Sequence, residues 1–419
     1  MANPSPSYRA TLAVPGFGRI IGASLIGRGA NQMLSVVIVL FVLARFHSPA
    51  LAGIAVFATI GPSLVVSPVA GALLDRYGRV RLMMLDYWLA AASLAVMAAL
   101  SVGGLLSPPV LVLVALVGGI TGILSAAGMR SVVPLLLPPD LWGRGNAIDS
   151  SGYTITVIIG PALGGFSVGV LGPEAAILIA AALYAAGAIS LLGAPEPGPK
   201  SRATESLLRS ALAGVQYVAR HAVLRAIAAS LVLLNIGAGV MVVAMPVLAL
   251  QHLHGSSAVV GILWALQGVG GASAGFIFGR LDTNGHERWI IVAAVVVTAI
   301  GTALMAVAPN LYALGVGSLV VGLATGPLDV TLFSLRQRVT GTQWLGRAIA
   351  VSMTFNFIGF PIGSALSGAF IAVGVRFALG LAAVLALCGG AVGALALPQP
   401  ARSGAGHQDH RQQDQRPAH

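Results

Sequence analysis

The chain has 419 residues, of which 57% are hydrophobic and only 8% are charged. Because an ordinary soluble domain is roughly 25% charged, this composition excludes a soluble globular protein and indicates a chain whose solvent is the lipid bilayer. The net charge of +11 would suggest a nucleic-acid partner in a soluble protein. Here basic loops at the membrane surface account for it, so no nucleic-acid partner is expected.

The apolar residues fall into segments that are long enough to cross the hydrocarbon as helices. Their continuous rather than alternating pattern disfavours a membrane β-barrel. The first 19 residues lack a short apolar core with a small-residue cleavage site, so we expect no cleaved signal peptide. The sequence therefore predicts an all-α integral membrane protein with twelve spans, at 18–45, 51–74, 83–104, 109–129, 147–171, 175–194, 225–250, 258–279, 289–308, 311–335, 348–373 and 378–398.

The longest polar stretch separates the sixth span from the seventh. It opens with the Pro/Gly-rich "GAPEPGPK" and continues as a basic amphipathic helix, as a hinge between two halves would. The polar C-terminus lacks apolar residues that could form a core, so it is expected to be disordered. The predicted organisation is a six-helix bundle at 1–194, a cytoplasmic linker at 195–224, a second six-helix bundle at 225–398 and a tail at 399–419.

The basic residues predict the orientation. With the N-terminus in the cytoplasm, twelve spans place all but three of the 23 Lys and Arg residues on the cytoplasmic side; the exceptions are Arg45, Arg376 and Arg28. Cytoplasmic loops carry an excess of positive charge. We therefore expect a multi-pass protein of the inner (plasma) membrane with both termini in the cytoplasm.

The two halves repeat each other in sequence. "VGGITGIL" at 117–124 matches "VGLATGPL" at 321–328, and "GPALGG" at 160–165 resembles "FPIGSALSG" at 360–368. Repeats that share one orientation predict two parallel six-helix units with a substrate site at their interface, near the midplane of the membrane.

Two motifs and one longer segment carry a family resemblance. "GALLDRYGRVR" at 71–81 resembles the loop 2–3 signature of the major facilitator superfamily, and "GPALGG" resembles the antiporter signature of its drug:proton exporters. "VVPLLLPPDLWGRGNAIDS" resembles the branch of macrolide and siderophore exporters. The resemblance implies the major facilitator fold and proton-coupled efflux of drugs or natural products by alternating access.

The loop 2–3 motif is the predicted gate. Its members are Gly71, Asp75, Arg76, Gly78, Arg79 and Arg81. The resemblance implies that Asp75 docks at the start of the eleventh span, near 346–350, where a helix dipole favours an anion. It would latch the halves when the transporter faces outward, with Arg76 and Arg79 completing the charge cluster. The alternative is a topology signal, which needs the arginines but neither Asp75 nor the glycines.

The fifth span contains the antiporter-type motif, made of Gly160, Pro161, Gly164 and Gly165. Small residues permit close helix packing, and proline permits a kink. The motif is expected to form a seam that bends during transport, and plain small-residue packing is the alternative. The counterpart expected in the second half consists of Pro361, Gly363, Ser364 and Gly368.

Ionisable residues inside spans are costly and usually functional. Asp329, in the tenth span, has no basic neighbour before Arg336 and is the leading proton-coupling candidate, because a buried carboxylate without a fixed partner can exchange protons near neutral pH. Asp149 and Asp86 are further proton-coupling candidates, whose alternative is a helix-terminal acid or charge partner.

Arg28 in the first span shares roughly one face with Asn31 and Gln32. It could bind an anion, pair with Asp149, or extend to the membrane surface. Asn235 and Gln267 are candidates to line the cavity, with polar contacts between helices as the alternative.

Other classes of activity have little support in the sequence. There is one cysteine, His47, His252 and His254 fall in outer loops, and no phosphate-binding Walker loop is present. We therefore expect neither a metal nor any other cofactor, and no enzyme activity; a membrane-embedded enzyme would need clustered catalytic residues. The expected function is a monomeric proton-coupled exporter of small amphipathic molecules. The rival within the same fold is an importer or facilitator of a small metabolite or lipid.

Overall fold

The computed structural model describes residues 7–198, 215–281, 285–340 and 345–396. Within these ranges the secondary structure is helical throughout, and twelve helical segments are long and apolar enough to cross a membrane. The prediction of an all-α protein with twelve spans is therefore confirmed. The amphipathic helix predicted in the linker falls partly, and the tail at 399–419 wholly, outside the described residues.

The first half of the chain contains six spans. The helices are α1 (Tyr8–Ala13), α2 (Phe17–Phe46), α3 (Pro49–Tyr77), α4 (Arg79–Val102), α5 (Pro108–Gly119), α6 (Gly122–Leu136), the short η1 (Pro139–Leu141), α7 (Trp142–Leu171) and α8 (Pro173–Leu191). The second half contains α10 (Ala222–Val247), η2 (Leu248–His252), α11 (Ser257–Phe278), α12 (Glu287–Val307), α13 (Leu311–Val339), α14 (Leu345–Val373) and α15 (Val375–Ala396).

Short turns with identifiable capping residues join the spans. The Ser48 side chain accepts a hydrogen bond from the backbone N–H of Leu51, and Pro49 occupies the first turn of α3, as is common at helix starts. Gly78, with φ of 96°, lets α4 begin directly after α3 ends. Glycine suits this position because other residues rarely adopt positive φ. We call the end of the molecule at Gly78 the basic end and the end at Ser48 the far end.

Two spans are less regular than the sequence predicts. The fourth span is broken at 120–121, so that α5 and α6 are separate helices, and α6 continues to Leu136, beyond the predicted boundary at 129. The seventh span ends in a π-helical turn, η2. Such irregularities inside a membrane require other partners for the freed backbone groups, and they often mark functional sites.

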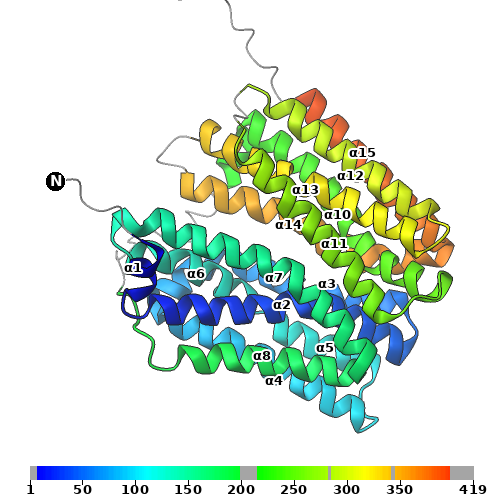
Figure 1. The fold of residues 1–419 in the computed structure, drawn as a ribbon, viewed down its shortest axis with the longest axis horizontal. Coiled ribbons are helices and arrows are strands. Elements are labelled where there is room, and N and C mark those ends of the chain that lie inside the picture. The colour runs from blue at the N-terminus through cyan, green and yellow to red at the C-terminus, as the bar shows by residue number, and fades with distance from the viewer. Residues whose placement is uncertain (1–6, 199–214, 282–284, 341–344, 397–419) are drawn as a thin grey trace, which may run out of the picture.

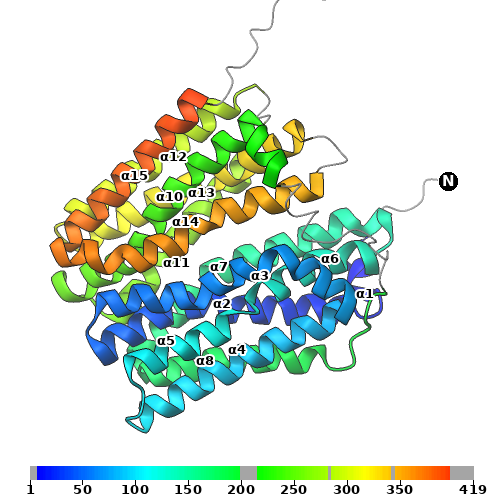
Figure 2. The same cartoon turned by 180° about the vertical axis from the view of Figure 1, so that it is seen from behind.

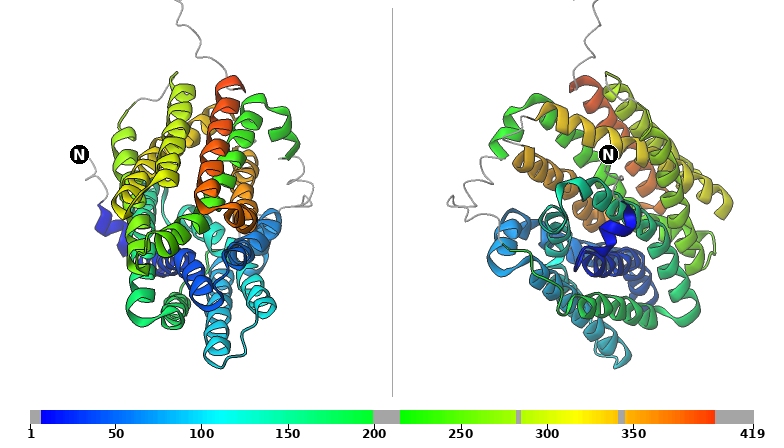
Figure 3. Two further views of the ribbon diagram at one scale, coloured as in Figure 1. Left: turned by 90° about the vertical axis from the view of Figure 1, so that its right-hand side faces the viewer. Right: turned by 60° about the vertical axis from the view of Figure 1, so that its left-hand side comes forward.

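The spans form two bundles, one from α2–α8 and one from α10–α15 (Figures 1 and 2). Viewed from either side, the ribbons of the bundles approach each other at the far end and diverge toward the basic end, near the N-terminus. Figure 3 shows the bundles from two further directions. The most extensive contacts between the halves are those of α3 with α14 and of α7 with α11, and α10 also touches α2 and α3.

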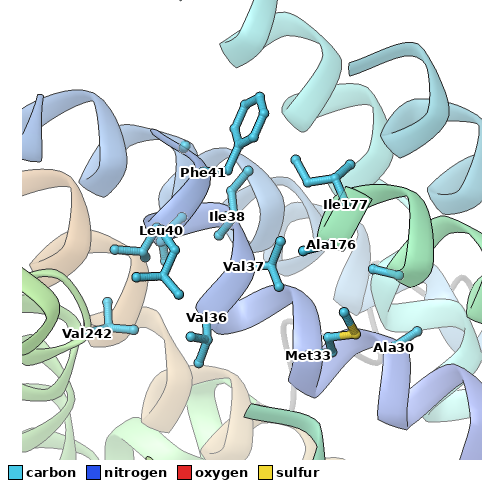
Figure 4. Packing of buried hydrophobic residues seen from close by; sticks show 14 of the residues in the cluster. Ala30, Met33, Val36, Val37, Ile38, Leu40, Phe41, Ala176, Ile177 and Val242 are labelled. Atoms are coloured by element: carbon cyan, nitrogen blue, oxygen red, sulfur yellow. The ribbon is translucent and has the colours of Figure 1, made fainter. Parts of the chain in front are cut away.

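The second part of α2 is buried in the core. Along its last four turns Val36, Val37 and Phe41 are at most 2% exposed, and Ala176 and Ile177 of α8 lie beside them (Figure 4). Lipid is as apolar as these side chains, so close van der Waals packing rather than removal of water stabilises this contact.

The contacts between the halves lie in the helix segments nearer the far end. A Cβ on Gly53 would strike the carbonyl oxygen of Ser364, and one on Gly165 would lie 2.6 Å from the Cα of Gly261. Ser364 is fully buried at this contact. The two halves therefore meet backbone to backbone at the far end.

Candidate functional site

The loop 2–3 motif forms a compact charged turn at the basic end. Asp75 forms an ion pair with Arg79 one turn later, and the Arg79 Nε donates to Ser131 Oγ of α6 at 3.1 Å. Arg79 is only 7% exposed, whereas the Asp75 side chain is 46% exposed. The turn thus joins α3, α4 and α6 through one buried guanidinium.

An acid outside the motif completes this cluster. The Glu196 carboxylate, just after the sixth span, accepts hydrogen bonds from the backbone N–H groups of Arg79 at 2.5 Å, Val80 at 3.1 Å and Arg81 at 3.2 Å. These are unsatisfied donors of the first turn of α4, where the helix dipole also favours an anion. Glu196 is not among the residues predicted from the sequence; its signal is an isolated acid between two prolines in "PEP".

The other motif residues contribute less in this conformation. The Arg76 guanidinium lies 5.3 Å from the centroid of the Tyr77 ring, and a Cβ on Gly71 would meet no atom within 4 Å. No contact in this state therefore requires glycine at position 71. The predicted docking of Asp75 against 346–350 involves side chains outside the described residues.

A second cluster lies inside the first bundle. Arg28 of α2 forms an ion pair with Asp149 of α7 at 2.7 Å, and the two side chains are 18% and 19% exposed. Tyr153, one turn after Asp149, places its ring centroid 5.8 Å from the guanidinium. Of the alternatives for Arg28, pairing with Asp149 is the one seen in the structure.

The neighbours of Arg28 on α2 have separate partners. Tyr184 of α8 donates its hydroxyl to Asn31 Oδ1 at 3.3 Å, while the Gln32 side chain lies near the Tyr153 hydroxyl. Gln32 and Arg28 therefore both contact the exposed Tyr153 side chain, and Asn31 joins α2 to α8. Tyr153 is a member of this cluster that the sequence analysis did not single out.

Asp329, in the other half, lies near enough to this cluster to interact with Tyr153 electrostatically. Asp329 is exposed even though it lies within the tenth span. Arg336, two turns later on α13, also interacts with it electrostatically. The sequence predicts Arg336 on the cytoplasmic side, just beyond a tenth span that ends at 335, whereas the structure places it inside α13, 2% exposed.

The antiporter-type motif lies on the face of α7 that contacts two other helices. Cβ atoms on Gly160 and Gly164 would clash with Met33 backbone atoms of α2 at 3.0 and 2.9 Å. Gly165 instead contacts Gly261 of α11. Pro161 lies inside the helix between these contacts.

The equivalent segment of α14 repeats this arrangement. A Cβ on Gly363 would clash with Ile236 of α10, and one on Gly368 would clash with Ala50 of α3. Ser364 is buried beside Gly53, and Pro361 lies within the helix. Each motif helix thus packs on the first helix of its own half and on a helix of the other half.

The remaining residues that the sequence suggests for the cavity or for proton coupling make contacts other than the Arg28–Asp149 ion pair. Asn235 donates to Asn356 Oδ1 of α14 at 3.0 Å, so it forms a polar contact between helices. The Gln267 Oε1 is buried and, among the described residues, accepts no hydrogen bond. Asp86 is 3% exposed inside the first bundle. No group of three potential metal ligands occurs in the described part of the chain.

Residues 7–415 match the family described as "Transmembrane secretion effector", a family of transporters in the major facilitator superfamily. The chain belongs to this family. It is 38% identical over 401 residues to the "Uncharacterized MFS-type transporter y4rN" of Sinorhizobium fredii, a match that covers 94% of this chain and 98% of the relative.

More distant members of the superfamily have named activities. The multidrug efflux pump Tap of Mycolicibacterium fortuitum is 25% identical, with 81% of this chain and 85% of Tap covered. The enterobactin exporter EntS of Shigella boydii is 26% identical, with 84% and 85% covered. With this family match and twelve apolar helices, the protein is a multi-pass membrane transporter of the major facilitator superfamily.

Solved structures agree with the fold. The D-xylose–proton symporter superposes with a TM-score of 0.70 at 15% identity, covering 94% of this chain and 99% of that one. A point mutant of the nucleoside transporter NupG gives 0.71 at 14% identity, with 90% and 99% covered. At these identities the likeness concerns the major facilitator fold alone.

Proposed function

We propose that this transporter exports small amphipathic molecules, drugs or natural products, in exchange for protons across the inner membrane, with both termini in the cytoplasm. The observation that carries the proposal is the Arg28–Asp149 ion pair of one half, with Tyr153 beside it and with Asp329 of the other half near enough to interact with Tyr153 electrostatically. Ionisable groups within membrane spans mark substrate paths and proton relays.

In the proposed cycle the conformation described above receives substrate from the cytoplasmic side, because its halves are in contact at the far end. The substrate competes with Asp149 for Arg28 or stacks on Tyr153. When the halves rock to open the far end, the substrate leaves and a proton from outside binds Asp329 or Asp149. The return movement delivers that proton to the cytoplasm.

The charged turn serves as the gate at the basic end. Glu196 and Arg79 hold the start of α4 in place, while the exposed Asp75 side chain is available to dock on the second half when the basic end closes. Asp75 would then exchange its pairing with Arg79 for the start of α14. The motif would in this way stabilise the outward-facing state.

Import is the alternative for this fold. NupG and the D-xylose–proton symporter have the same fold, so the fold leaves the direction open. Export is favoured because Tap and EntS, both named for efflux, are related over more than four-fifths of the chain. Their printed activities support a similar, amphipathic substrate class here.

The test uses the purified protein in liposomes with its cytoplasmic face outward and an acidic lumen. We expect ethidium to accumulate in the lumen, an uncoupler to abolish accumulation, and Asp329→Asn to slow it by about tenfold, equivalent to ~1.4 kcal/mol in the transport barrier. Asp140→Asn, which neutralises an exposed acid of η1, is the matched control and should transport normally.

Two results would contradict the proposal. Transport that ignores the pH gradient would exclude proton coupling. Ethidium accumulation that requires the opposite gradient would indicate import.

A further inference from the structure

Asp86 is a buried acid with an unusual set of partners. Its Oδ1 accepts a hydrogen bond from Thr121 Oγ1 at 2.8 Å. Ser125, whose hydroxyl donates to the Gly122 carbonyl at 3.5 Å, lies near enough to favour the ionised carboxylate. Thr121 directly precedes α6 and Ser125 lies in its first turn. The carboxylate of α4 thus holds the start of a helix that begins inside the membrane.

Among the described residues, no basic side chain forms an ion pair with Asp86. The titratable groups facing it are Tyr87 on its own helix and Tyr184 on α8. Arg28 of α2 acts on Tyr87 and is paired with Asp149. An ionised carboxylate removed from water without a countercharge is costly.

The helices on either side of the break are held differently. A Cβ on Gly119, at the end of α5, would lie 2.6 Å from the carbonyl oxygen of Ala58, so α5 is packed firmly against α3. The start of α6 instead depends on Asp86. Further along α6, Ser131 accepts the hydrogen bond from Arg79 of the gate. The helix α6 therefore connects the buried acid with the loop 2–3 motif.

The internal repeat shows that this position is shared by the two halves. At the repeat offset of 204 residues, Thr121 corresponds to Thr325 and Ser125 to Asp329. The second half has no break there, since α13 runs from Leu311 to Val339. Each half therefore has one carboxylate near this repeated segment. In the second half it is Asp329, on the segment itself, and in the first half it is Asp86, on the neighbouring helix α4.

We propose that Asp86 is a proton-binding residue whose protonation releases the start of α6 and so loosens the contact of α6 with Arg79. An ionised carboxylate accepts hydrogen bonds at both oxygens, whereas a protonated one must donate from one of them. Proton binding therefore removes an acceptor from Thr121 or Ser125. The link from this event to transport rests on the proposed proton-coupled function.

The test is hydrogen–deuterium exchange of the full-length protein in lipid nanodiscs at a series of pH values, corrected for the intrinsic pH dependence of exchange. We expect the first two turns of α6 to exchange about fivefold faster below a transition pH, as the loss of one hydrogen bond implies. Asp86→Asn should abolish the transition, and Asp140→Asn should preserve it.

A second variant keeps the test decisive if Asp86→Asn folds poorly. Ser125→Ala retains the carboxylate but removes a hydroxyl that stabilises its ionised form, so the transition should move to higher pH. A transition that is absent in the wild type, or unchanged in both Asp86→Asn and Ser125→Ala, would overturn the proposal. Exchange is measured without transport, so failure of proton-coupled export in liposomes would be recognised separately.

Discussion

The Arg28–Asp149 pair is an interaction that holds two helices together and that, in the proposed cycle, also takes part in transport. It joins α2 to α7 at 2.7 Å, yet each side chain keeps nearly a fifth of its surface accessible. A fully buried pair would be difficult to break, because one charge would be left without compensation. Partial exposure lowers that cost, so a substrate or a proton can compete for either partner.

The strength of the pair can be measured with a double-mutant cycle of Arg28→Gln and Asp149→Asn. We expect a coupling energy of about 1 kcal/mol in the free energy of unfolding, because the pair is neither fully exposed nor fully buried. Denaturant unfolding in mixed micelles gives the values. A coupling energy of zero would show that the pair adds nothing to stability in this state.

At the scale of helices, the glycines of α7 determine which neighbours can approach. Gly160 and Gly164 lie against α2 in the same half, whereas Gly165 lies against α11 in the other half. One helix face therefore has a permanent contact and, in the proposed cycle, a contact that must open. Small residues allow both because no side chains interlock across the seam.

Gly165→Val should prevent closure of the far end, because its Cβ would lie 2.6 Å from backbone atoms of Gly261. We expect a cysteine introduced at Ser364, which is fully buried at the far-end contact, to react about tenfold faster with a polar maleimide in a Cys388→Ser background as the closed state is depopulated. Gly143→Val is the matched control, since a Cβ there meets no atom within 4 Å. Equal reactivity of the two variants would contradict a gate at this seam.

The spans were predictable because each must satisfy its own backbone in lipid and therefore appears as a long apolar run. The break between α5 and α6 was not, because Gly118 and Gly119 in an apolar run equally indicate helix packing. Glu196 was missed because it binds α4 more than 110 residues away in sequence, and such long-range contacts leave no local pattern. The Arg28–Asp149 pair was predictable only as one of several alternatives. The spacing of residues in the first span shows which of them share a helix face with Arg28, but it does not show which residue of another helix pairs with it.

At the scale of the molecule, the contacts between the two halves are concentrated at the far end. The backbone contacts of α3 with α14 and of α7 with α11 lie toward the far end, while the ribbons diverge at the basic end (Figure 1). Alternating access also requires a conformation that is closed at the basic end and open at the far end. That conformation must be stabilised by contacts that are not formed in the one described here. In our proposal Asp75 supplies one of these contacts.

Asp75→Asn should shift the equilibrium toward the conformation described here. An amide retains the size of the side chain but loses the charge that favours a helix N-terminus, so we expect about a fivefold change in the population ratio. Spin labels at Gly143 and Arg280, on opposite halves at the basic end, report the distance distribution. An unchanged distribution would reduce the motif to a topology signal.

The position of Glu196 also bears on where this chain can be divided. The sequence places Pro195 and Glu196 in the linker, yet Glu196 is bound to α4 and Pro195 lies against Gly16. For co-expression of separate halves, or for chimaeras with relatives, the N-terminal fragment must extend through these residues. A fragment ending at 194 would leave the first turn of α4 without its acid and would make the halves seem less separable than they are.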